Sequence, residues 1–63
     1  MTHINIATHA PKTLEKLKEI AELSDGAIVN CEGYPTSLSI DIVNEGDVDI
    51  VIEMVKEKGL LIL

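Results

Sequence analysis

The sequence predicts a single α+β domain over residues 1–63, of the ferredoxin-like βαββαβ type, with an antiparallel sheet and two helices on one face. Two observations predict this fold class. Short apolar or alternating stretches, typical of strands, occupy residues 3–7, 27–31, 37–43 and 60–63. Two stretches with helical spacing, residues 12–23 and 48–58, separate the first strand from the second and the third from the fourth. A chain of this length has a marginal core, so help from self-association is expected.

The first strand and the first helix have clear local signals. Residues 3–7 place Ile4 and Ile6 on one face. Pro11 suits the first turn of a helix, where its missing N–H costs nothing. Leu14, Leu17 and Ala21 then form one helical stripe, and the turn at residues 24–26 ends the helix.

The middle of the chain predicts two more strands. Residues 27–31 form the first of them. Cys31, the only cysteine, lies two residues after Val29, and we expect a buried, inert thiol there. Residues 37–43 alternate cleanly, so Leu38, Ile40 and Ile42 are expected to face the core, while the serines and Asp41 face water.

Residues 48–58 fit two structures. Val48, Val51 and Val55 have helical spacing, and Asp47 and Gly59 are suitable caps at the two ends. The same residues also alternate and are rich in β-branched side chains, which would suit a hairpin arm paired with residues 37–43. We favour the helix, because the signals at both of its ends agree. Ile50 and Met54 would then lie beside the core stripe as extra apolar surface, which favours a homodimer or a partner contact.

The charges are strongly segregated along the chain. The net charge is −6, no arginine is present, and the five lysines lie within residues 12–18 and 56–58. Nine acidic residues lie between Lys18 and Lys56 with no basic residue among them. Phosphate contacts need Lys or Arg, and base stacking needs aromatics, of which Tyr34 is the only one. We therefore expect no direct nucleic-acid binding, and a basic protein surface as partner.

No stretch is long and apolar enough to cross a membrane, and no secretory signal is visible. A lone cysteine fits a reducing compartment, so a cytoplasmic location is expected.

Several segments together resemble the heavy-metal-associated domains of copper chaperones. The matching segments are the first strand, the loop at residues 8–12, the turn at 25–27 and the closing pattern from Asp49 to Leu60. The resemblance implies the ferredoxin-like fold. The two cysteines that bind Cu(I) in that family are replaced here by His9 and Lys12, and an ammonium group repels a cation. Sulfur-carrier proteins that start a helix with Cys-Pro are also similar, but this chain has Ala10-Pro11.

Two functions follow as expectations. The first is a small acidic, non-enzymatic protein-interaction module, an inhibitor or regulator that docks on a basic, nucleic-acid-binding surface of its partner. The residues expected to bind are Glu45, Asp47, Asp49 and Glu53. The alternative is a degenerate metal- or sulfur-carrier-like domain that uses His9, at the start of the first helix. Neither catalysis, a cofactor nor a resident metal is expected, because no nucleotide, zinc or paired-carboxylate motif is present.

Overall fold

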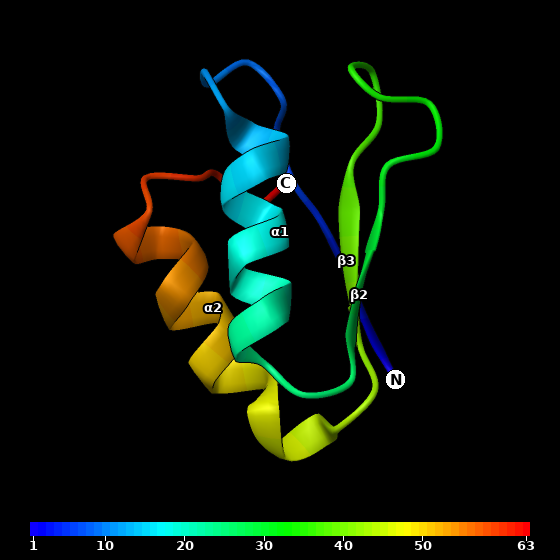
Figure 1. Cartoon of the computed structure of the whole chain (residues 1–63), viewed down its shortest axis with the longest axis vertical. Coiled ribbons are helices and arrows are strands. Elements are labelled where there is room, and N and C mark those ends of the chain that lie inside the picture. The colour runs from blue at the N-terminus through cyan, green and yellow to red at the C-terminus, as the bar shows by residue number, and fades with distance from the viewer.

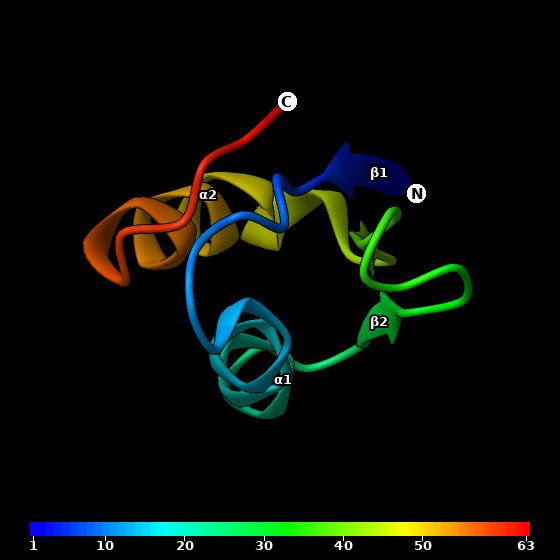
Figure 2. The ribbon, with the colours of Figure 1, turned by 90° about the horizontal axis from the view of Figure 1, so that it is seen from above.

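The computed structural model describes all residues, 1–63, and has two layers (Figure 1). One layer is a three-stranded antiparallel sheet in the order β1-β3-β2, and the other contains both helices. Figure 2 shows the same separation from above, with α1 and α2 on one side of the strands. The element order is β1 (Thr2–Asn5), α1 (Thr13–Leu23), β2 (Ala27–Asn30), β3 (Ser39–Ile42), the 3-10 turn η1 (Glu45–Asp47) and α2 (Val48–Glu57). This confirms the α+β class and the choice of a helix for the region after residue 47.

The predicted fourth strand is a correction. Residues 60–63 form one isolated bridge, between Ile6 and Ile62, and no strand, so the sheet is not a complete ferredoxin-like sheet. Two backbone hydrogen bonds hold the segment, from Ala7 N to the carbonyl of Leu61 and from Leu63 N to the carbonyl of Asn5. The segment lies beside the end of β1 and the residue after it, so it pairs with only a short stretch at one end of this edge strand. An apolar run does not by itself supply the ladder of hydrogen-bonded partners that a strand needs, and Leu61 and Leu63 are exposed.

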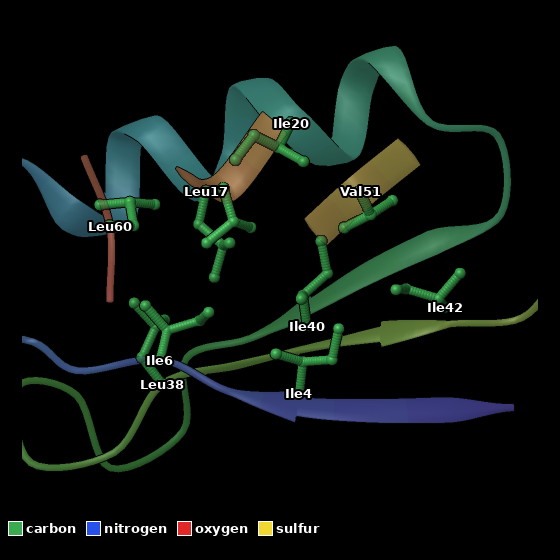
Figure 3. Packing of buried hydrophobic residues seen from close by; sticks show 10 residues of the cluster. Ile4, Ile6, Leu17, Ile20, Leu38, Ile40, Ile42, Val51 and Leu60 are labelled. Carbon is green, nitrogen blue, oxygen red and sulfur yellow. The ribbon is translucent and has the colours of Figure 1, made fainter. Parts of the chain in front are cut away.

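The core lies between the layers and is aliphatic. Leu17 and Ile20 of α1 point toward the sheet, where Ile4, Ile6 and Ile40 meet them (Figure 3). Leu38, Ile40 and Ile42 are buried as their alternation predicted. Ser39, expected to face water, is only 4% exposed, because it lies in the middle strand between Asn5 and Asn30 of the two neighbouring strands. Val51 and Val55 bring α2 onto the same cluster.

Neither helix, at 11 and 10 residues, is long and apolar enough to cross a membrane.

The start of α1 differs from the expectation based on Pro11. The helix begins at Thr13, and Lys12 precedes it in the left-handed conformation, with φ 59°. The hydroxyl of Thr13 donates to the carbonyl of Ala10 at 2.6 Å, which fixes the loop below the first turn. Gly26 has φ 82° in the turn after the helix, a value that suits glycine.

Candidate protein-interaction surfaces

The four residues predicted to bind a partner do not form one continuous set. Glu45 and Asp47 lie in η1, whereas Asp49 and Glu53 lie in α2. Residues four apart on a helix share a face, so Asp49 and Glu53 are neighbours on the outer side of α2. Asp47 is four residues before the buried Val51 and is only half-exposed, so it lies toward the core side at the start of the helix.

Glu45 already has partners within the chain. Its carboxylate forms a salt bridge with the amino group of Met1 at 2.8 Å and accepts a hydrogen bond from the hydroxyl of Thr2 at 2.7 Å. These contacts lower the pKa of Glu45, with the hydrogen bond from the amino group as the larger cause and the one from Thr2 as the second. The carboxylate thus joins the start of β1 to η1, and its charge is partly neutralised there.

Glu57 lies on the same outer face of α2 as Asp49 and Glu53. It lies four residues after Glu53 and is exposed like Asp49 and Glu53. We call Asp49, Glu53 and Glu57 the α2 acidic row. None of the three forms a hydrogen bond or an ion pair, the salt bridges being those of Glu45, Asp41 and Glu19. Ile50, which is 57% exposed, lies beside the row and supplies an apolar contact within it.

The α2 acidic row destabilises the helix when no partner is bound. Like charges at i and i+4 destabilise a helix by about 0.2–0.5 kcal/mol a pair, and this row contains two such pairs. Lys56 lies three residues after Glu53 and offsets part of the repulsion. A positively charged partner would relieve the remainder, because it would face three carboxylates that have no counter-ion in the chain.

No helix lies on the side of the sheet away from α1 and α2 (Figure 1). His3 of β1 stands opposite Asp41 of β3, and its Nδ1 lies 2.5 Å from an Asp41 carboxylate oxygen. Its Nε2 lies 3.1 Å from the side-chain oxygen of Asn5. Both ring nitrogens thus face acceptors, which suits the doubly protonated imidazolium. The pKa of His3 is raised, chiefly by the hydrogen bond to Asp41 and with a smaller contribution from Asn5.

The residues that share the outer side of the sheet with this ion pair are mostly polar. By the alternation of strands, residues that share a face with His3 and Asp41 point away from the helices. Val43 lies across Gly26, with its Cβ 3.6 Å from the position of an added Cβ there. Within the three strands Ile28, at 57% exposed, is the only apolar residue among the six that share this side: His3, Asn5, Ile28, Asn30, Ser39 and Asp41. We call these six residues the open sheet face.

Sequence reasoning missed this face for a definite reason. It placed Asp41 on a solvated strand face but had no partner for it, because the register between β1 and β3 is not encoded in either strand alone. The pairing of residues 38 positions apart supplies the partner, His3. The available signal was His3 two residues before Asn5, on the polar side of an alternating strand.

His9 and Cys31 are not gathered into a site. No group of three or more His, Cys, Asp or Glu side chains comes together, and the surface has no pocket. His9 is exposed in the loop before α1, so the alternative function has no second ligand beside it. Cys31 is exposed, contrary to the expectation of a buried thiol, because β2 ends at Asn30 and the chain turns away at once.

Comparison with protein families, with characterised proteins and with solved structures gave no match.

Proposed function

We propose that this chain is a small non-enzymatic interaction module that docks on a basic protein surface through the outer face of α2. The observation that carries the proposal is the α2 acidic row, three exposed carboxylates at four-residue spacing with no ion pair. Such a row gives steering and specificity toward a positively charged partner. The exposed side chain of Ile50 beside the row would add apolar contact with the partner to the attraction between opposite charges.

The distribution of the remaining acidic residues supports the same surface. Three acidic residues lie on α1, two on η1 and three on α2, so eight of the eleven belong to the helical layer. Within the strands Asp41 is the only acidic residue, and it is paired with His3. Lys16 and Lys18 offset two of the three acidic residues of α1, whereas only Lys56 lies among the five acidic residues of η1 and α2. The net negative charge of the helical layer is therefore greatest along η1 and α2, and a basic surface that binds nucleic acid in another context is the partner chemistry it fits.

The test compares two variants with the same change in charge. The first neutralises the row, as Asp49→Asn, Glu53→Gln and Glu57→Gln. The control neutralises three exposed residues near α1, as Glu15→Gln, Glu22→Gln and Asp25→Asn. Proteins that the wild-type chain retains from a native lysate are purified, and their affinity is measured as salt is raised.

The expected result is a partner whose affinity falls with salt and falls at least about tenfold in the row variant, with a smaller loss in the control. An affinity that is constant in salt, or an equal loss in both variants, would contradict docking through α2.

A further inference from the structure

We infer that a second copy of this chain pairs along the free edge of β2, so that two three-stranded sheets join into one continuous sheet. The order β1-β3-β2 leaves β1 and β2 as the edge strands. Residues 60–63 already lie along part of β1, whereas no segment pairs with the outer side of β2. The inference does not rest on the proposed function, because α1 is the helix nearer to β2 and α2 lies toward β1 (Figure 2).

The hydrogen bonds of β3 determine which backbone groups of β2 point outward. In an antiparallel sheet, alternate residues of a strand bond to the neighbours on its two sides. The amide of Ile6 donates to the carbonyl of Leu38, so the even-numbered residues of β3 bond to β1 and its odd-numbered residues bond to β2. Ile28 and Asn30 lie opposite those odd-numbered residues. The backbone groups of the other two residues of β2 therefore point to the free edge.

These outward groups, of Ala27 and Val29, are largely unpaired. The N–H of Ala27 donates to the carbonyl of Ser24 at 3.3 Å, and no bond within the chain uses its carbonyl or either backbone group of Val29. The edge is also open to water. Both residues face the helices but remain partly exposed, whereas Ile40 and Ile42 opposite them are fully buried. An edge strand with no charge, proline or covering segment is a template for another strand, and β2 has none of the three.

A two-fold axis beside Ile28 makes two copies of this edge complementary. With Ile28 opposite Ile28 of the other copy, Val29 of each chain lies opposite Ala27 of the other. The N–H of Val29 then donates to the carbonyl of Ala27 across the axis, and the same bond is repeated in the opposite direction. Both bonds use groups that are free in the single chain. Ile28, the only apolar residue of the open sheet face, gains an apolar neighbour on the adjacent strand.

The charges allow a second copy at this edge, although the chain has a net charge of −6. α1, which flanks β2, has two lysines against three glutamates, and one of these, Glu19, is held by Lys58. The carboxylates nearest in sequence to β2 are those of Asp25 and Glu32, beyond its two ends, where water and salt screen them. Since the only unpaired charge at this edge is negative, the dimer should become tighter as salt is raised. Docking of the α2 acidic row on a basic partner should instead weaken with salt.

The experiment is sedimentation of the whole chain between about 10 μM and about 1 mM, a range that detects weak as well as firm association. The test variant is Ile28→Lys, because a lysine on an edge strand opposes pairing with another strand. The matched control is Ile50→Lys. Both isoleucines are 57% exposed, one on β2 and one on α2, so the two changes are equal in chemistry and in starting exposure.

The wild-type chain is expected to sediment as a dimer at the upper concentrations, and more so at higher salt. Ile28→Lys is expected to raise the dimer dissociation constant at least about tenfold, while Ile50→Lys leaves it within about twofold of the wild-type value. A wild-type chain that stays monomeric throughout would overturn the inference and leave the edge to a strand of another protein. An equal loss of dimer in the Ile50→Lys variant, or a dimer that weakens with salt, would also overturn it.

Hydrogen exchange of single amides tests the edge itself. The N–H of Val29 is free in the single chain, so it is expected to exchange quickly in the Ile28→Lys variant and at least about tenfold more slowly in the wild-type dimer. The N–H of His3, which points away from β3 on the opposite edge strand, is the control and should exchange quickly in both. Rapid exchange at Val29 in the wild-type dimer would refute pairing through β2.

Discussion

The two outer sides of this molecule use polar groups in opposite ways. On α2 the carboxylates of Asp49 and Glu53 stand in a repulsive row without partners, whereas on the sheet the carboxylate of Asp41 is matched by His3 within the chain. The first side keeps its charge available to another molecule, and the second pairs its one carboxylate with a histidine of the neighbouring strand among uncharged residues. The difference indicates that a 63-residue domain can carry two unlike surfaces, because two thin layers give it two independent outer faces.

The largest effect should come from the core that supports both sides. Ile40 is fully buried at the centre of β3, and Ile40→Ala removes packing from both layers. We expect a loss of about 2–5 kcal/mol in the free energy of unfolding, enough to unfold most of a small domain. Ile28→Ala, on the exposed side of the neighbouring strand, should cost within about 1 kcal/mol. Urea denaturation measures both, and equal losses would mean that Ile28 is also part of a buried contact.

A change of sign in the acidic row should separate binding from stability. Glu53→Lys converts two repulsive i, i+4 pairs into attractive ones and turns the pair with Lys56 repulsive. The free energy of unfolding is therefore expected to change by about 0.5 kcal/mol or less, while affinity for a basic partner is lost. Thermal unfolding followed by a binding measurement tests this, and intact binding would remove α2 from the interface.

The His3–Asp41 pair should give the open sheet face a dependence on pH. The pKa of His3 is raised in the fold, so its contribution to stability is full below the unfolded value near 6.5 and is lost as pH rises through the folded pKa. The stability difference between the wild-type chain and Asp41→Asn should therefore be larger at acidic than at alkaline pH. NMR titration of the His3 ring should show the midpoint falling in the variant. An unchanged midpoint would mean that Asp41 does not hold the ring.

The smallest expected effect is that of Glu45, and its contribution to stability depends on pH in the opposite direction to that of His3. Its pKa is lowered in the fold, so its contribution is present above the unfolded value near 4.5 and is lost as pH falls through the folded pKa. The stability difference between the wild-type chain and Glu45→Gln should shrink on acidification. Because the carboxylate is exposed, we expect a small difference even at neutral pH. A difference that grows on acidification would contradict the pairing with Met1 and Thr2.

Local signals in the sequence predicted most of the fold. The helical stripe through Leu17 and the burial of Ile40 depend on near neighbours, and the structure agrees with them. Residues 48–57 are helical as expected, but the side chain of Asp47 makes no capping hydrogen bond. The fourth strand and the burial of Cys31 failed, because both depend on where a neighbouring segment ends in space. The His3–Asp41 pair on the open sheet face could not be predicted from the sequence for the same reason. The register of β1 against β3 brings together two residues that are 38 positions apart in the chain.

The strand order has a consequence for synthesis of the chain. β3 is the middle strand, and it is the last of the three to appear along the sequence. Until residues 39–42 have been synthesised, β1 and β2 lack the strand with which both pair, and α1, at 11 residues, is only marginally stable without the sheet on which it packs. The sheet is therefore expected to assemble in one late step, when residues 39–42 become available to pair with β1 and β2, and a chain truncated before Ser39 should contain no sheet and little stable helix.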